Sequence, residues 1–149
     1  MKQTKGKSDG LGMAQTNHFT HQKLQSIFTH NYILRTGDIN ILTETKLSDD
    51  RPRIAPDICI WENAHMYDDI DPENPLLTIE ITHSKSNDRY SEKVILDAFR
   101  RYPSILESFI YNFDEQKWIR YTPTENGILK EEGKNYSKLL KCYLKTFLI

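Results

Sequence analysis

Two carboxylates followed by a lysine form the part of this sequence best suited to chemistry. Asp57 opens an apolar run directly after Pro56, and Glu80 interrupts a second apolar run at 76–81. Carboxylate oxygens are the ligands that hard divalent cations prefer, and Mg²⁺ commonly binds one or two of them beside water and phosphate. The cation lowers the pKa of a bound water, and a nearby ammonium such as that of Lys93 can stabilise developing charge. These residues therefore predict a metal-dependent hydrolytic site.

Glu80 carries the strongest signal, because it lies in the most apolar stretch of the chain. A carboxylate in a central strand is unfavourable unless it is paired or binds a cation. Asp57 also fits an ordinary turn aspartate after a proline, and Lys93 also fits an exposed helix lysine. Of the histidines, His83 is a candidate proton donor because it follows Glu80 by three residues.

Three further histidines fall on the first predicted helix: His18, His21 and His30. His18 and His21 are about one helical turn apart, so both could touch the same ligand. No carboxylate or cysteine stands close to them in the sequence. Solvated helix positions are therefore preferred to metal ligands for these side chains.

The elements that would position these residues begin with a helix at about 18–34, which the spacing of Leu24, Ile27 and Phe28 predicts. An alternating strand at 39–47 and a charged turn at 48–53 follow. Strands at 57–62 and 76–81 come next, separated by a solvated acidic loop at 62–74. The second of these strands is apolar enough to be central and covered on both faces.

The second half begins with a helix at about 90–102, which ends before Pro103. Its predicted core stripe consists of Ile95, Ala98, Phe99 and Tyr102. Strands at 108–113 and 117–122 form a hairpin, a short strand lies near Ile128, and 136–148 is predicted to be an amphipathic helix with Lys138, Lys141 and Lys145 on one face. The strand–helix–strand segment over 76–113 predicts a right-handed parallel crossover.

The predicted order is α-β-β-β-α-β-β-(β)-α, an α/β (α+β) fold with a central mixed sheet flanked by helices. The 149 residues fit a single domain at 18–149 after a mobile tail at 1–17 that holds few apolar residues. No apolar run approaches the roughly 20 residues that span a bilayer. No signal sequence is recognisable, so a cytoplasmic location is expected.

The formal net charge is −1. A dedicated nucleic-acid binder is usually basic, so this value argues against tight, non-specific binding to DNA. It leaves room for a nuclease with a local basic face. The two cysteines, Cys59 and Cys142, are far apart and have no metal-type spacing, so they are expected to be reduced thiols.

The order of motifs over 56–112 resembles the PD-(D/E)xK phosphodiesterase superfamily, and within it the restriction-endonuclease-like family called Uma-two. The resemblance rests on PDICIW at 56–61, on LLTIEI at 76–81 with the Ser/Thr-rich turn after it, on the spacing of Asp88 and Lys93, and on LESFIYN at 106–112. It implies a restriction-endonuclease-like core around these motifs.

The resemblance also implies a site that cleaves phosphodiester bonds with Mg²⁺ (or Mn²⁺). Asp57 and Glu80 would bind the metal, together with the carbonyl of Ile81. The superfamily lysine stands two residues after the glutamate, where this chain has Thr82. Lys93, on the following helix, is the matching residue for the lysine of the Uma-two family.

Several residues remain secondary candidates for the site. Lys85 and Arg89 are substitutes for Lys93, and Asp88 fits both a site residue and a helix N-cap. Glu44 is a candidate for orienting a water molecule from the neighbouring strand, and Gln22 is a weaker one from the first helix.

Three functions stay open at this point. The first is an endonuclease that hydrolyses DNA by metal-activated water, expected as a homodimer. The second is a catalytically degenerate module for DNA or protein interaction. The third is a metal hydrolase for a small phosphorylated substrate.

Overall fold

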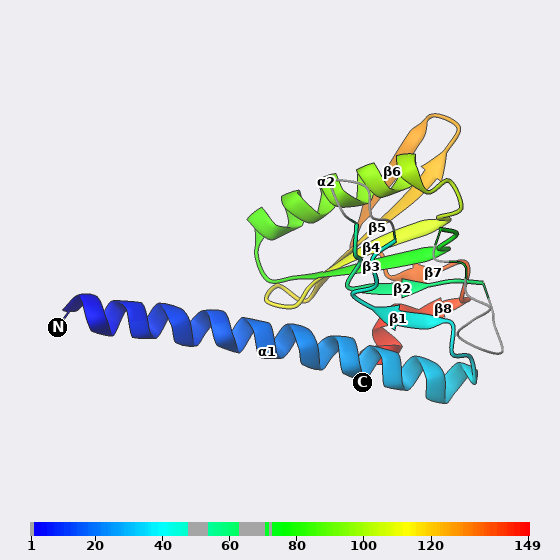
Figure 1. The fold of residues 1–149 in the computed structure, drawn as a ribbon. Coiled ribbons are helices and arrows are strands. Elements are labelled where there is room, and N and C mark those ends of the chain that lie inside the picture. Colours follow the sequence, from blue (N-terminus) through cyan, green and yellow to red (C-terminus); the bar gives the residue numbers. More distant parts are fainter. Residues whose placement is uncertain (1, 48–53, 63–70, 72) are drawn as a thin grey trace.

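Six strands form one mixed sheet in the order β1-β2-β3-β4-β5-β6 (Figure 1). The structure is a computed structural model that describes residues 2–47, 54–62, 71 and 73–149, with side chains from residue 16 onward. Its elements are α1 (Lys2–Thr36), β1 (Ile41–Thr43), β2 (Ile58–Ile60), β3 (Leu77–Thr82), α2 (Lys85–Arg101), β4 (Glu107–Asn112), β5 (Lys117–Thr124), β6 (Gly127–Glu132), β7 (Tyr136–Ser137), β8 (Cys142–Tyr143) and the 3₁₀ helix η2 (Leu144–Leu148).

The central strands β3 and β4 are parallel, and the other neighbouring pairs of this sheet are antiparallel. Helix α2 connects β3 to β4, because a parallel pair needs a long crossover. The predicted fold class, a mixed α/β fold with a central sheet flanked by helices, is therefore confirmed.

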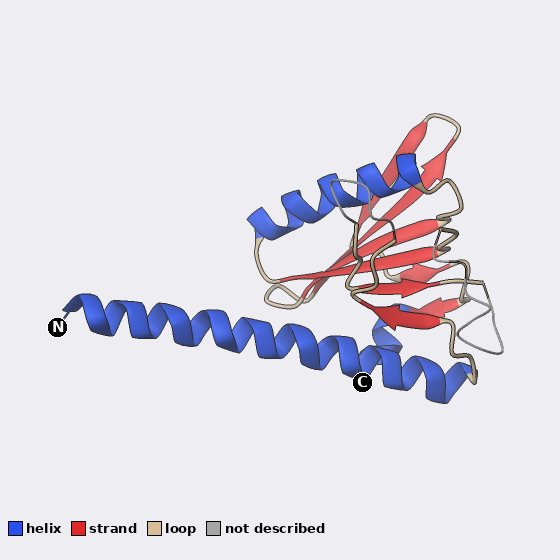
Figure 2. Cartoon of the chain, viewed as in Figure 1, coloured by secondary structure: helices blue, strands red, loops and turns tan. Residues whose placement is uncertain are grey.

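Two apolar cores lie on opposite faces of the sheet, one under α1 and η2 and the other under α2 (Figure 2). The side chains of β2 point alternately into one core and the other. Ile58 and Ile60 belong to the core under α1, whereas Cys59 and Trp61 belong to the core under α2. Successive side chains of a strand point to opposite faces, so a continuous apolar run is what a strand covered on both faces requires.

Helix α1 packs on the sheet through its C-terminal half, where Phe28 and Tyr32 are each 1% exposed. The Tyr32 hydroxyl donates to Asn40 Oδ1 at 2.8 Å, and Asn40 Nδ2 donates to the Trp61 carbonyl at 2.6 Å. These buried bonds tie the helix to the start of the sheet. The helix begins at Lys2, so the tail predicted at 1–17 is helical over residues 2–17 and projects beyond the sheet (Figure 1).

Helix α2 begins at Lys85, five residues earlier than the predicted start near Tyr90. Ser84 is its N-cap, because the Ser84 hydroxyl accepts a hydrogen bond from the backbone N–H of Asn87 at 3.1 Å. Asp88 is therefore not the cap. The predicted core stripe is correct, since Ile95, Ala98, Phe99 and Tyr102 are buried.

The C-terminal segment is not the amphipathic helix predicted at 136–148. It forms the short pair β7 and β8 and then η2. Glu107, 2% exposed, accepts hydrogen bonds from the Ser137 hydroxyl and from the backbone N–H groups of Lys138 and Leu139, both at 3.2 Å. This buried carboxylate accepts the hydrogen bonds that the donors of the turn between β7 and β8 would otherwise lack. The helical periodicity of the segment gives no sign of this long-range contact.

Two predicted segments lie outside the described residues: the charged turn at 48–53 and most of the acidic loop at 62–74. Among the described helices, none is long and apolar enough to cross a membrane.

Candidate metal centre

Three carboxylates line up across neighbouring strands at one end of the sheet. Thr43 pairs with Ile58, and Ile58 pairs with Ile79. Continuing both registers by one residue sets Glu44 opposite Asp57, and Asp57 opposite Glu80. Like charges directly opposite each other destabilise a sheet. A cation bound beside this row would offset the repulsion.

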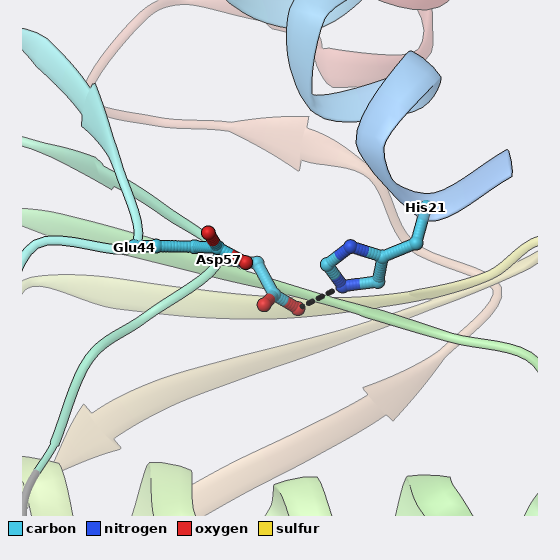
Figure 3. Close-up of side chains that lie close together, drawn as sticks. All are labelled: His21, Glu44 and Asp57. Carbon is cyan, nitrogen blue, oxygen red and sulfur yellow. Dashed lines mark ion pairs between the residues drawn. The ribbon is translucent and has the colours of Figure 1, made fainter. Parts of the chain in front are cut away.

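Asp57 is held from two sides. Its Oδ2 accepts a hydrogen bond from the backbone N–H of Ile81 at 2.7 Å. The same oxygen lies 3.1 Å from Nε2 of His21, which reaches it from α1 (Figure 3). In addition, Gln25 Nε2 donates to the Asp57 carbonyl at 2.9 Å. Asp57 is thus fixed between the β3 backbone and the first helix.

The neighbourhood changes the proton affinity of Glu80 and His21. Burial, and then the nearby charge of Asp57, raise the pKa of Glu80 well above its usual range. The hydrogen bond to Asp57 raises the pKa of His21, and the charges of Asp57 and Glu44 act in the same direction. Burial at Glu80 and the negative charge of Asp57 beside both groups thus favour their protonated forms.

Glu44 has an unusual backbone, with φ of 51° directly after β1. This left-handed conformation favours glycine, and few glutamates adopt it. The N–H of Glu44 donates to the carbonyls of Pro56 and Asp57, at 3.0 and 3.3 Å. The turn ends β1 beside Asp57, and in Figure 3 the Glu44 side chain extends toward that carboxylate.

The three carboxylates line a cleft of about 440 Å³. Besides Glu44, Asp57 and Glu80, it is lined by Asn17, His18, His21, Ile81, Thr82, His83, Asn87, Tyr90, Ser91 and Phe113. The end of β3 and the start of α2 thus form one wall, and α1 forms another. None of the described residues that line the cleft is a lysine or an arginine.

The structure brings some of the predicted site residues together and keeps others apart. Asp57, Glu80, Ile81, Glu44 and His83 all line the cleft. Gln22, in contrast, is exposed on α1.

The predicted cations lie elsewhere. Lys93 is exposed on α2 and is not among the described residues that line the cleft. Lys85 and Arg89 line a neighbouring cleft of about 670 Å³, as does Asp88. Asp88 accepts hydrogen bonds from the Thr82 hydroxyl and from Asn112 Nδ2, the latter at 3.2 Å, so it joins α2 to the ends of β3 and β4. The sequence-based role of Lys93 stays a prediction.

His21 was the main residue that sequence reasoning misjudged. The sequence predicts a solvated helix position for His21, but in the structure the His21 Nε2 contacts Asp57 and the His21 side chain is only 23% exposed. His21, Gln25, Phe28 and Tyr32 recur at intervals of four, three and four residues, and the last three are buried. Extending that buried face by one turn toward the N-terminus would have placed His21 against the sheet.

With this geometry in view, comparison with solved structures finds a chain of similar fold. It is a crystal structure described as "a putative nuclease belonging to DUF820" from Anabaena variabilis ATCC 29413. The TM-score is 0.51, at 16% identity, over 87% of this chain and 79% of the other chain. The two chains share a fold. No protein-family model matches the sequence, and no curated protein does.

The donor set fits a divalent cation. His21, Glu44 and Asp57 each offer one ligand atom, and these atoms lie within 4.8 Å of one another. Glu80 adds a carboxylate beside Asp57. Oxygen and imidazole donors facing an open cleft leave room for water or substrate, as in catalytic metal sites.

Proposed function

We propose that the chain is a metal-dependent endonuclease that hydrolyses phosphodiester bonds in DNA. The observation that carries the proposal is the row of the Glu44, Asp57 and Glu80 carboxylates that lines one cleft. The nuclease description of the protein that shares the fold supports it, as does the resemblance to the Uma-two family.

Asp57 and Glu80 would hold the cation, with the carbonyl of Ile81 as a further ligand. Mg²⁺ or Mn²⁺ is the proposed ion, and it would lower the pKa of a water molecule and offset charge on the phosphate. The backbone N–H of Ile81 keeps the Asp57 carboxylate oriented, at 2.7 Å. Preorganised ligands of this kind need not be reorganised when substrate binds.

His83, the candidate proton donor of the sequence, is the residue that would transfer a proton at this site. It lines the cleft directly after β3. Its ring meets that of Phe113 edge to face, with the ring centroids 6.0 Å apart, which restricts its orientation. An imidazole there can accept a proton from the attacking water or donate one to the leaving oxygen.

The test is cleavage of supercoiled plasmid in the presence of Mg²⁺ or Mn²⁺. The wild type is expected to nick the plasmid, and Asp57→Asn and Glu80→Gln are expected to lose at least about 100-fold in rate. Glu125→Gln, at the exposed turn between β5 and β6, is the matched control and should retain the wild-type rate. Nicking that survives both site substitutions would contradict the proposal.

A second candidate is a catalytically degenerate module that binds DNA or protein. The absence of lysine and arginine among the described residues of the cleft favours it. In this case the wild type would nick no plasmid and no divalent ion would raise its melting temperature.

The proposal also includes a homodimer, because cutting both strands of a duplex commonly uses two copies of a site. A cytoplasmic location is part of the same proposal. Light scattering would then give a particle of twice the 17.5 kDa of one chain. A monomer that still nicks one strand would remove the dimer from the proposal and leave the chemistry.

A further inference from the structure

Helix α1 places a nitrogen donor, His21, at the candidate metal site. The carboxylates of Asp57 and Glu80 alone would offer only oxygen ligands. Nε2 of His21 lies 3.1 Å from Oδ2 of Asp57, and Glu44 approaches from the other side (Figure 3). The potential ligand atoms of these three residues lie within 4.8 Å of one another, a spread that one ion can bridge with small side-chain movements. They come from α1, the end of β1 and the start of β2.

The position of His21 is set by the packing of the helix. One turn further along, Gln25 is 5% exposed and donates to the Asp57 carbonyl at 2.9 Å. Phe28 and Tyr32 then bury the same face of the helix in the core. The imidazole is therefore directed at Asp57 by a fixed element, as a ligand needs to be.

Glu44 is positioned by its backbone. The left-handed φ of 51° turns the chain immediately after β1, and the hydrogen bonds to the carbonyls of Pro56 and Asp57 hold that turn against β2. A glutamate at a position that favours glycine agrees with a use for its carboxylate.

The chemistry of the donor set distinguishes between ions. Mg²⁺ prefers oxygen ligands and keeps several waters, whereas imidazole suits first-row transition metals. Mn²⁺ accepts both carboxylate oxygen and imidazole nitrogen. The imidazole of His21, added to the carboxylates of Glu44, Asp57 and Glu80, should therefore favour Mn²⁺ over Mg²⁺.

We propose that His21, Glu44 and Asp57 form a mixed nitrogen and oxygen metal site, and that His21 makes this site prefer a first-row transition-metal ion, here Mn²⁺, to Mg²⁺. The inference rests on the proposed metal-dependent function and specifies its ion. It assigns a metal ligand to α1, the helix on which the sequence offered only Gln22 as a weaker candidate.

The first experiment measures Mn²⁺ bound to the whole wild-type chain by pulsed electron paramagnetic resonance. Coupling to a ¹⁴N nucleus is expected from a directly bound imidazole. The coupling should vanish in His21→Gln and persist in His30→Gln, which changes an exposed histidine on the same helix. Bound Mn²⁺ without ¹⁴N coupling, or a coupling that survives in His21→Gln, would overturn the inference.

The second experiment compares Mn²⁺ and Mg²⁺ affinities by calorimetry. The wild type should bind Mn²⁺ at least about tenfold more tightly, and His21→Gln should reduce this ratio toward one. Glu80→Gln should weaken both ions.

The outcomes separate this inference from the proposed function. Equal affinities in the wild type, with both ions lost in Glu80→Gln, would overturn the role of His21 and leave the metal-dependent function standing. No binding of either ion would overturn both.

Discussion

Glu80 and His21 hold protons more tightly in the folded chain than in the unfolded chain. Burial and the charge of Asp57 raise the pKa of Glu80 above 4.5. The hydrogen bond to Asp57 raises the pKa of His21 above 6.5. Above each of these reference values, and up to the raised pKa, the native state binds more protons than the unfolded state. The free energy of unfolding contributed by these groups therefore falls as pH rises.

The first prediction follows from this sign. Without divalent ions, the melting temperature of the wild type should fall between about pH 5 and about pH 8, relative to that of Glu80→Gln. Added Mn²⁺ should raise the wild-type value more at the upper end of this range, because metal ligands must be deprotonated. Thermal unfolding followed by circular dichroism measures both effects. Parallel curves for the two proteins would mean that Glu80 titrates normally.

Glu44 allows a second prediction at the same scale. Its left-handed backbone disfavours any residue with a Cβ by about 1 kcal/mol relative to glycine. Glu44→Gly should therefore be about 1 kcal/mol more stable than Glu44→Ala in urea denaturation without metal, while both bind Mn²⁺ more weakly than the wild type. If the alanine variant is equally stable, the backbone at residue 44 is not left-handed in solution.

At the scale of the elements, Glu107 anchors the C-terminal segment to the sheet. Its carboxylate accepts three hydrogen bonds from the turn between β7 and β8. Glu107→Ala would leave these donors unpaired, so the loss of stability should be about 3 kcal/mol. Urea denaturation measures it, with the exposed Glu132→Ala as the control. A loss below about 0.5 kcal/mol would show that the turn forms without this carboxylate.

The strands were predictable because their local patterns agree with their surroundings. The apolar run at 57–62 contains β2, which is shortened to Ile58–Ile60, and the run at 76–81 became β3 shifted by one residue, Leu77–Thr82. Asp57 and Glu80 were recognisable as acidic side chains in these apolar runs. The antiparallel register, continued by one residue beyond Ile58 and Ile79, sets them opposite each other.

The remaining features depend on contacts between segments far apart in the chain. The sequence at 136–148 has a helix-like spacing of leucines, but the buried Glu107 organises it as two short strands. His21 meets Asp57 only because Phe28 and Tyr32 determine which face of α1 is buried. The start of α2 at Lys85 is the exception, because the Ser84 hydroxyl caps the helix through a local hydrogen bond from Asn87.

At the scale of the whole molecule, the net charge of −1 limits how DNA can be bound. The fourth prediction is that Glu80→Gln binds a short duplex weakly and with strong salt dependence. The slope of log K against log salt should be negative, by about 0.9 for each phosphate that the protein neutralises. Fluorescence anisotropy at several salt concentrations measures this slope. An affinity that does not change with salt would instead favour a small phosphorylated substrate.

The most direct test of the account is the location of Mn²⁺ in a crystal of the wild-type protein. Its anomalous signal should give one strong peak in the cleft, within about 2.0–2.4 Å of carboxylate oxygens of both Asp57 and Glu80. The same peak should be absent from crystals of Asp57→Asn. Anomalous density elsewhere on the molecule, with none beside these two carboxylates, would contradict the metal centre on which the proposed function depends.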